Sequence, residues 1–460
     1  MFRSLGRIAV LASLLGLAIS HSAGAVPAFA RQTGQACVAC HVSFPELTPY
    51  GRLFKLSGYT IGSRLTLPLA FMVQAGDTGV RKNRDDQGAQ IVPKTHSTQV
   101  SSASLFVAGK INDNVGGWIQ WTYNNLYVND AGKTVGHSGI DNTDLRVVGR
   151  QTDAEGTSIR WLYGLTIHNS PTVQDVWNST PAFGFPFTLP PNMISPVAAT
   201  MLDGTLAQQV AGVGGYVFWN RSLYFELTGY RTADGIFSPL RAGQDVHTPG
   251  GVHRLAGLNP YWRLAWNREW GSNSLMLGAY GLRVRVYPDN TLPFTPTDRY
   301  TDIAVDAQYQ YITDPHTFAL QATRIHERQS YLASFPASEA GAAIGAGPAP
   351  ANPRDTLNTS RLKATYYFRR RYGVTLSWFS TTGSSDSGLY APGSVDGSLS
   401  GKPDTNGYIT EFDYLPVQNL RLMLQYYDYR KFNGGRANYD GSGRSAKDNN
   451  TWFLNLWFVY

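Results

Sequence analysis

The chain ends in the ten residues TWFLNLWFVY (Thr451 to Tyr460), whose bulky side chains at every second position would form one face of a β-strand. Similar segments with one apolar and one largely polar face occur near residues 64–75, 298–312 and 356–369. A single segment of this kind is weak evidence. Because the pattern recurs until the end of the chain, it predicts a protein built from many β-strands.

The amino-acid composition favours strands that cross a membrane. Charged residues make up 15% of the chain, against roughly 25% in ordinary globular domains. Aromatic residues reach 13%, with 26 Tyr and 11 Trp, and Gly is abundant at 47. Beyond the N-terminal leader there is no apolar run of roughly 18 residues, the length that a membrane helix needs. The sequence therefore predicts a transmembrane antiparallel β-barrel.

The number and spacing of the candidate strands agree with this fold. The candidates number about sixteen, an even number, as expected for a bacterial barrel. They lie near residues 64–75, 98–111, 115–126, 140–150, 157–168, 206–220, 222–231, 260–270, 272–286, 298–312, 316–327, 356–369, 372–382, 404–414, 419–431 and 449–460.

Short turns alternate with long connections such as 169–205 and 328–355. Outer-membrane barrels have short periplasmic turns and long extracellular loops, so both ends of the barrel are expected at the periplasmic mouth. A soluble β-propeller also has many strands, but it would show a repeat of about 40–50 residues. No such repeat is recognisable.

The second decisive stretch is Cys37-Val38-Ala39-Cys40-His41, because the spacing CxxCH is that of covalent haem c attachment. These are the only two cysteines in 460 residues. In this arrangement the two thiols form thioethers and His41 is the proximal iron ligand. A redox disulfide of the thioredoxin type would need a neighbouring βαβ unit, and a structural zinc site would need four ligands. We therefore expect one covalent haem c.

The N-terminus resembles a secretory signal peptide. Arg3 and Arg7 precede the apolar run IAVLASLLGLAI, which is followed by two small-x-small sites. Cleavage after Ala25 fits the distance from the apolar run, and Ala30 is the second candidate. We therefore divide the chain into a signal peptide (1–25), a monohaem c-type cytochrome segment (26–63) and an outer-membrane barrel (64–460).

The cytochrome segment is too short to enclose a haem with a core of its own. The barrel must supply the rest of the pocket, most simply by taking the segment into its lumen as a plug. A sixteen-stranded barrel has a lumen wide enough for this.

With this arrangement the chain resembles the fused monohaem cytochrome–porins of bacterial outer membranes, typified by the iron-oxidising outer-membrane cytochrome. The segment AVPAFARQTGQACVACHVSFPELTPYGRLFKLSGYT (Ala25 to Thr60) carries the resemblance, and NSPTVQDVWNSTPAFGFPF (Asn169 to Phe187) looks like a stretch found in relatives. The resemblance implies that electrons pass from an extracellular donor, Fe(II) in the best-known members, to a periplasmic cytochrome. Relatives for which iron oxidation is not established leave the donor open.

The sixth iron ligand is open. Met72 is the first candidate because the strand pattern points it inward, close in sequence to the haem segment, and a Met/His pair raises the reduction potential. Met423 and His168 also point inward, and an ordinary barrel-lining role is the alternative for all three. Arg52 and Lys55 could pair with the haem propionates, or simply be solvated charges.

The loop 169–205 is rich in Pro and aromatic residues, which favours folding into the barrel rather than exposure. Asp302 and Asp306 are expected to face the lumen without forming an iron site. The remaining histidines of interest, expected in or beside loops and facing solvent, are His96, His247 and His316.

Two classes of function remain. In the first, an electron carrier, the barrel surrounds one haem c that links an extracellular donor to a periplasmic c-type cytochrome or other acceptor; whether this makes it an iron(II):cytochrome c oxidoreductase is undecided. In the second, the protein is a porin for small solutes with the haem segment as plug or sensor. Lipid contact is expected in either case. No basic run interleaved with aromatics suggests nucleic-acid binding, and both a monomer and a trimer are compatible with the sequence.

Overall fold

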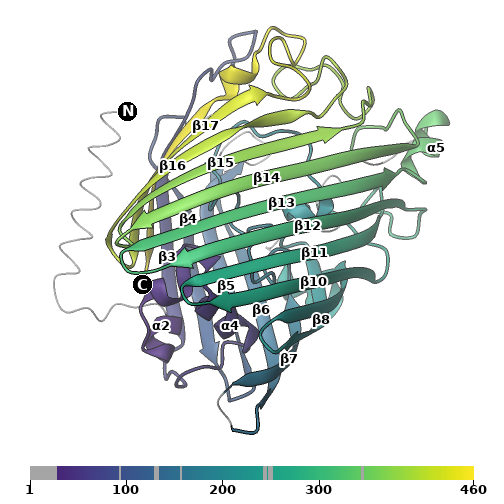
Figure 1. Ribbon diagram of the computed structural model, residues 1–460. Coiled ribbons are helices and arrows are strands. Elements are labelled where there is room, and N and C mark those ends of the chain that lie inside the picture. Colours follow the sequence, from purple (N-terminus) through teal and green to yellow (C-terminus); the bar gives the residue numbers. More distant parts are fainter. Residues whose placement is uncertain are drawn as a thin grey trace.

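The computed structural model describes residues 28–92, 95–128, 134–155, 158–241, 246, 252–342, 345 and 347–460. Within these ranges sixteen antiparallel strands form one closed barrel, which confirms the predicted fold (Figure 1). The ring closes where the last strand pairs with the first, with Val459 opposite Met72. The predicted signal peptide, residues 1–25, lies outside the described residues.

The first eight strands of the barrel are β3 (Leu69–Val80), β4 (Gln99–Lys110), β5 (Val115–Val128), β6 (Thr134–Thr152), β7 (Ile159–His168), β8 (Val210–Trp219), β9 (Leu223–Thr232) and β10 (Asn259–Trp270). The other eight are β11 (Asn273–Val286), β12 (Asp298–Ile312), β13 (His316–Ser330), β14 (Arg354–Phe368), β15 (Tyr372–Gly383), β16 (Thr405–Val417), β17 (Leu420–Lys431) and β18 (Thr451–Val459).

The connections are as asymmetric as predicted. The turns β8–β9, β10–β11, β12–β13 and β14–β15 are tight and lie at the end of the barrel where β3 begins and β18 ends. The opposite end carries the long loops, including 169–205, 331–353 and 432–450. By the usual asymmetry of outer-membrane barrels, the short-turn end faces the periplasm.

The outer surface of the barrel is apolar. On β12 the outward residues Ile303 and Val305 are 49% and 54% exposed, and their neighbours Asp302 and Asp306 are buried in the lumen, as predicted. Exposed aromatic side chains lie near the short-turn rim, among them Trp161, Trp219, Trp270, Tyr311, Tyr372 and Tyr414. An apolar band bounded by an aromatic girdle is what a barrel needs in a bilayer. The protein is therefore a porin-like barrel of the bacterial outer membrane.

The first barrel strand differs from its predicted position, 64–75, because β3 runs from Leu69 to Val80. Pro68 has no N–H for the ladder, so the alternation in residues 64–68 does not continue the strand. The far half of β3 lacks an apolar alternation but still pairs with β18. A Cβ on Gly79 would lie 2.2 Å from Nε1 of Trp452, so glycine leaves room for that indole.

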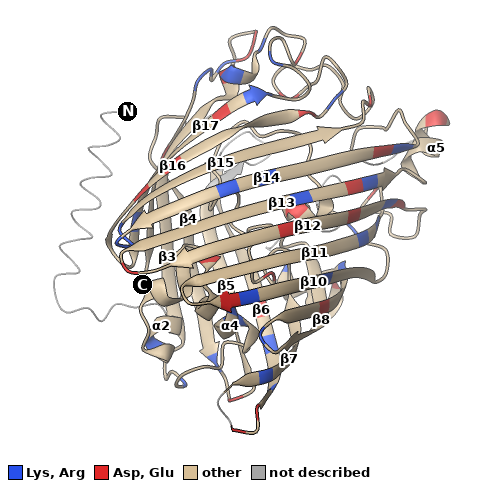
Figure 2. Cartoon of the chain, viewed as in Figure 1, with Lys and Arg blue, Asp and Glu red and all other residues tan. Residues whose placement is uncertain are grey.

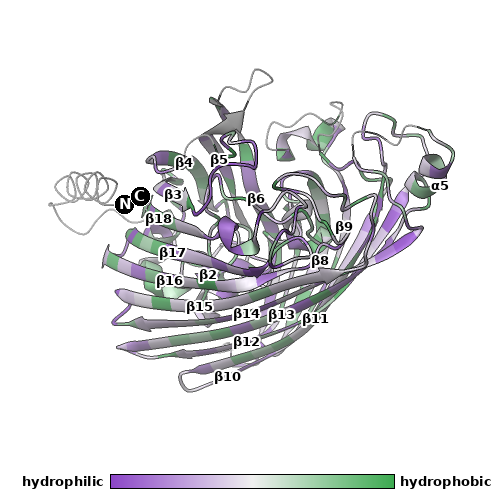
Figure 3. Cartoon of the chain, turned by 90° about the horizontal axis from the view of Figure 1, so that it is seen from above, coloured by the Kyte–Doolittle hydropathy of each residue, from purple (hydrophilic) through white to green (hydrophobic). Residues whose placement is uncertain are grey.

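The N-terminal segment, which we define as residues 28–63, lies in the lumen. Figure 3 looks into the barrel from above and shows chain segments within the ring of strands. The segment contains α2 (Ala28–Thr33), α3 (Cys37–Cys40), β1 (His41–Ser43), β2 (Glu46–Leu47) and α4 (Pro49–Leu56). None of the helices in the described part of the chain is both long and apolar enough to cross a membrane.

The N-terminal segment binds strands on different sides of the barrel. Glu46 forms a buried ion pair with Lys363 of β14, with a distance of 2.8 Å between Oε2 and Nζ. The hydroxyl of Tyr59 donates to Asp144 of β6 at 2.6 Å. The backbone oxygen of Leu56 accepts a hydrogen bond from a tyrosine of β8. The segment is thus fastened across the lumen, as a plug would be.

The long loop, residues 169–205, also folds into the lumen, which confirms the predicted infolding. Trp177 is 1% exposed, and its backbone oxygen accepts hydrogen bonds from Gln308 of β12 and Gln321 of β13. Farther along, the backbone oxygen of Phe185 accepts from Tyr427 of β17. The loop therefore crosses from its own strands, β7 and β8, to the far wall.

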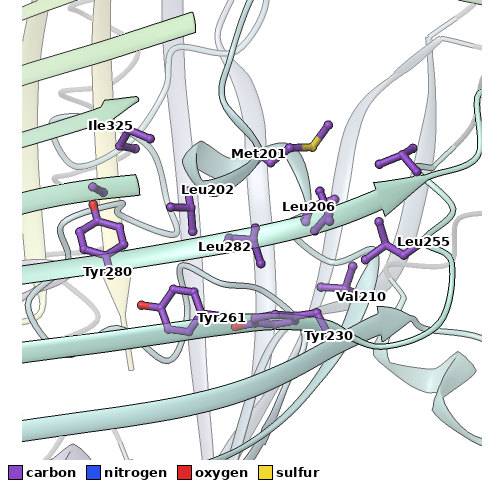
Figure 4. Close-up of a cluster of buried hydrophobic side chains, with 13 residues drawn as sticks. Met201, Leu202, Leu206, Val210, Tyr230, Leu255, Tyr261, Tyr280, Leu282 and Ile325 are labelled. Carbon is purple, nitrogen blue, oxygen red and sulfur yellow. The ribbon is translucent and has the colours of Figure 1, made fainter. Parts of the chain in front are cut away.

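The last turn of the long loop, η1 (Met201–Thr205), packs on the wall. Figure 4 shows Leu202 and Leu206 near Leu282 of β11, with tyrosines of β9 to β11 close by, and Met201 belongs to the same buried cluster. The lumen carboxylates Asp302 and Glu327 accept the backbone N–H groups of Leu202 and Met201 at 2.8 and 2.7 Å. Asp302 thus has a structural partner in the loop.

Three further short helices lie in the long connections, at the loop end of the barrel. They are η2 (Gly235–Leu240), α5 (Ser334–Glu339) and η3 (Ala446–Asn449).

The ion pair between Glu46 and Lys363 can be tested by the substitution Glu46→Gln. This change leaves a buried ammonium without its carboxylate, which typically costs about 3 kcal/mol. We expect backbone hydrogen exchange in residues 41–56 to accelerate at least about tenfold, because the segment opens locally. Mass spectrometry of peptides measures this. The control is Glu339→Gln on the exposed helix α5, and equal exchange in both variants would contradict the role of the ion pair.

Candidate functional site

The CxxCH motif forms a compact turn inside the barrel. Cys37 and Cys40 lie at the two ends of the short helix α3, and their thiols are free. His41 follows in extended conformation. The motif is held by Thr48, whose hydroxyl donates to the backbone oxygen of Ala39 at 2.5 Å and whose backbone N–H donates to that of Cys40 at 2.9 Å.

The local sequence explains why α4 packs against this turn. Thr48 is the N-cap of α4, where its hydroxyl accepts the N–H of Gly51 at 3.1 Å, and Pro49 occupies the first turn. Gly51 faces the motif so closely that a Cβ there would lie 2.2 Å from the backbone oxygen of Cys40. Only glycine allows this approach.

The turn opens on a cavity of about 1360 Å³, counting the open space at its mouth. Cys37, Cys40 and His41 line it, and most of the other lining side chains are apolar or aromatic. They include Phe29, Phe44, Phe54, Phe106, Trp118, Val173, Phe183 and Trp457. These come from the N-terminal segment, the barrel wall and the long loop together.

The cavity lies toward the short-turn end of the barrel. Its wall residues stand on the first part of β3, the last part of β4, the start of β5 and the end of β18. All four positions adjoin the mouth at which the barrel begins and ends. Residues of the long loop, among them Val173 and Phe183, complete the lining.

Met72, the predicted sixth ligand, lines the cavity and is 2% exposed. Met423 and His168 also point into the lumen, as predicted, but neither belongs to the cavity lining. His168 is bound to the hydroxyl of Tyr230 at 2.7 Å and to the hydroxyl of Thr166 at 3.1 Å. Of the three candidates, Met72 alone shares the cavity with His41.

Arg52 and Lys55, predicted near the haem propionates, differ in position. Arg52 is buried and donates to Gln308, Gln310 and Ser274 of the wall at 2.7–2.9 Å, away from the cavity lining. Lys55 does line the cavity. Its ammonium already donates to the backbone oxygens of Val173 and Asp175 in the long loop.

Burial sets the protonation of the motif. Desolvation raises the pKa of the Cys40 thiol to about 11 and lowers the pKa of His41 to about 4. The imidazole is therefore neutral at neutral pH, the form that binds metals. Its buried Nδ1 has no hydrogen-bond partner among the described residues. A neutral imidazole and two free thiols beside an apolar cavity fit the attachment of a haem c.

The two other interpretations of the cysteine pair find no support in the described ranges. The sheets there are antiparallel, so the pair does not adjoin a βαβ unit. No group of three or more His, Cys, Asp and Glu side chains that could hold a metal ion is found in those ranges.

The remaining predicted residues lie elsewhere. His316 is exposed at the tight turn after β12, where its ring contacts Tyr366. His96 lies in the loop after β3 against the ring of Trp452, and His247 falls outside the described residues. Asp306 is not free in the lumen but forms an ion pair with Arg263 at 2.5 Å.

The sequence did not indicate which wall residues hold the N-terminal segment. Lys363, Asp144 and Arg421 lie far from it in sequence, and only the fold brings them together. Trp457 in the cavity wall could have been found, because it alternates with the outward residues of the last strand.

Among the comparisons with known proteins, only the one with solved structures gave matches. No family model matches the chain, and no curated protein matches it. The chain is similar to the outer membrane channel DcaP of Acinetobacter baumannii (13% identity over 85% of this chain and 96% of that one, TM-score 0.46). It is also similar to outer-membrane expressed OmpT of Vibrio cholerae (10%, 85% and 97%, 0.42) and to Salmonella typhi OmpF in complex with daunomycin (11%, 85% and 97%, 0.44). One is described as a channel and none as a haem protein.

The close packing at Gly51 can be tested by Gly51→Ala. The new methyl group meets the backbone oxygen of Cys40, so we expect α4 to move away from the motif at a cost of about 1–3 kcal/mol. In protein produced without haem attachment, alkylation of Cys37 and Cys40 should become at least about fivefold faster. The control is Gly347→Ala, where a Cβ would meet nothing within 4 Å. Equal alkylation rates in the two variants would refute this explanation of Gly51.

Proposed function

We propose that this protein carries one covalent haem c in the cavity beside Cys37, Cys40 and His41, and transfers electrons between the cell exterior and the periplasm. The observation that carries the proposal is the opening of the CxxCH turn on an apolar cavity inside an outer-membrane barrel. A haem c bound there would supply one-electron redox chemistry.

The residues of the chain have separate roles in this proposal. Cys37 and Cys40 would hold the haem by thioethers, and His41 would bind its iron. Met72 would be the second protein group on the iron, because its thioether is buried in the same cavity, and Met/His ligation would favour a high potential, suited to accepting electrons. Lys55 helps to orient the N-terminal segment through its contacts with the long loop. We do not assign Arg52 to the cofactor, because its guanidinium donates hydrogen bonds to side chains of the barrel wall.

The side chains around the cavity give it an apolar lining. Phe44 and Phe183 both contact Trp457 of β18, with ring centroids 6.1 and 5.5 Å apart. Phe29 stacks on Tyr59 with ring centroids 5.1 Å apart and contacts Phe54. Burial of this kind is one of the means by which a protein tunes a haem potential.

The position of the cavity indicates from which side each redox partner would approach the haem. It lies near the short-turn mouth, so a periplasmic c-type cytochrome or other acceptor could approach it closely. An extracellular donor has to enter the lumen and pass the long loop. We propose Fe(II) as the first donor to test, as the family resemblance implies.

We also propose that the signal peptide is cleaved after Ala25. A mature chain that begins at Val26 retains Phe29, which lines the cavity and packs between Phe54 and Tyr59. Cleavage after Ala30 would remove this ring.

The second candidate is a porin for small solutes in which the N-terminal segment serves as plug or sensor. The porin-like outer-membrane barrel supports this candidate more directly than it supports an electron carrier. The two candidates differ in whether solutes pass beside the segment.

Ligation can be tested by spectroscopy of the purified holoprotein. The double substitution Cys37→Ser with Cys40→Ser should abolish covalent haem. Met72→Leu should retain haem but remove the charge-transfer band of Met-ligated ferric haem and lower the reduction potential. The matched control is Met423→Leu, since Met423 is equally buried but lies outside the cavity lining. An unchanged spectrum in Met72→Leu would exclude Met72 as ligand, and a wild-type protein without haem would refute the proposal.

Electron transfer can be tested in sealed proteoliposomes that contain the oxidised protein. Addition of Fe(II) outside should produce the reduced haem c bands rapidly, since the donor enters through the barrel. Parallel solute-efflux measurements on the same vesicles report the channel activity. A haem that is reduced by dithionite but not by Fe(II) would remove iron as donor, and rapid solute efflux would then favour the porin.

A further inference from the structure

A second cleft lies on the outer surface of the barrel, away from the haem cavity. It is lined by Trp378 of β15, Asn406 and Tyr408 of β16, Arg430 of β17, and three residues of the loop 432–450. The loop residues are Arg436, Ser445 and Lys447. With the open solvent at its mouth, the cleft encloses about 1520 Å³. Nothing in the proposed electron transfer uses it.

The cleft carries an excess of positive charge. Arg430 pairs with Asp428 at 2.7 Å and lies over the ring of Tyr408, 5.8 Å from its centroid. Arg436 and Lys447 are exposed, and neither forms an ion pair within the part of the chain that the structure describes. Figure 2 shows Lys and Arg positions (blue) at the outer end of β17 and in the loop beyond it. Two cations thus remain available for an anion.

The cleft lies near the extracellular end of the barrel. It adjoins the long-loop end of β16 and β17, which faces the cell exterior. Toward the bilayer, the next outward side chains are Leu376 on β15, Thr410 on β16 and Asp428 on β17. One step farther, Phe412 and Tyr426 are 53% and 45% exposed, and Leu376 is 57% exposed. The basic cleft therefore lies on the exterior side of a mainly apolar surface, with Trp378 and Tyr408 near the boundary.

We propose that this cleft binds a phosphorylated glycolipid of the outer leaflet of the outer membrane. The phosphate is held by Arg436 and Lys447 together with Arg430, because guanidinium and ammonium groups are the usual partners of phosphate. The acyl chains lie along the apolar strands below. Basic pockets beside membrane-spanning elements are known to bind lipid headgroups.

Charge and position together favour a lipid over a soluble anion. A free phosphate would need the cations but would gain nothing from the exposed rings and leucine beneath them. A glycolipid uses both. The inference rests on the barrel and its orientation alone, so it does not depend on whether the protein carries a haem.

The test is native mass spectrometry of the full-length protein in detergent, titrated with bisphosphorylated lipid A. The double variant Arg436→Gln with Lys447→Gln should bind at least about tenfold more weakly, since two charge-assisted hydrogen bonds are lost. The matched control is Arg268→Gln, because Arg268 lies over Trp270 at the same distance of 5.8 Å but at the short-turn rim. The control should bind like the wild type. If the double variant does not fold, Lys447→Gln alone replaces it.

Dephosphorylated lipid A and inorganic phosphate distinguish the sources of the anion. Weak binding of the dephosphorylated lipid, together with failure of millimolar phosphate to displace lipid A, is the expected result. Equal affinity of the double variant and the control, or of the two lipids, would overturn the proposal. Displacement by phosphate alone would also overturn it, since the cleft would then be a site for a soluble anion.

Discussion

Three arginines buried in the lumen, Arg146, Arg263 and Arg421, govern how the interior of this barrel is filled. Each has a carboxylate from the wall, because a buried charge without a partner is very costly. Each also contacts the long loop or the N-terminal segment inside the lumen. Arg146 donates to the backbone oxygen of Gln174 at 3.0 Å and Arg421 to that of Phe44 at 3.0 Å, while the guanidinium of Arg263 lies over the ring of Trp177. The wall, the long loop and the N-terminal segment therefore depend on one another.

Much of the barrel could be predicted from period-2 alternation alone. Outward apolar side chains on β12 and β14, inward Asp302 and Asp306, and short turns at one end follow from local sequence and the rules for membrane barrels. The first strand was placed too early because Pro68 interrupts an otherwise regular pattern. Its second half was missed because it lacks an apolar alternation. Glycine is required at position 79 because the indole of Trp452, on another strand, occupies the space of a side chain there, and the sequence of β3 alone cannot reveal this contact.

The candidate site was predicted to a lesser extent. CxxCH is a local motif, and the inward direction of Met72 follows from parity, so both could be read from the sequence. The partners of the N-terminal segment could not, because contacts such as Glu46 with Lys363 join residues 317 positions apart. Arg52 illustrates the difficulty, since its charge suggested a propionate partner and the fold gives it glutamines of β12 instead.

The pairing of β18 with β3 has a consequence for biogenesis. Met72 stands on the first strand, and Trp457 and Val459 stand on the last, yet all three line the same cavity. The cavity is therefore complete only when the two ends of the barrel have met. The N-terminal segment contacts β14 and β17 from the inside, so its own anchorage also depends on strands near the end of the chain.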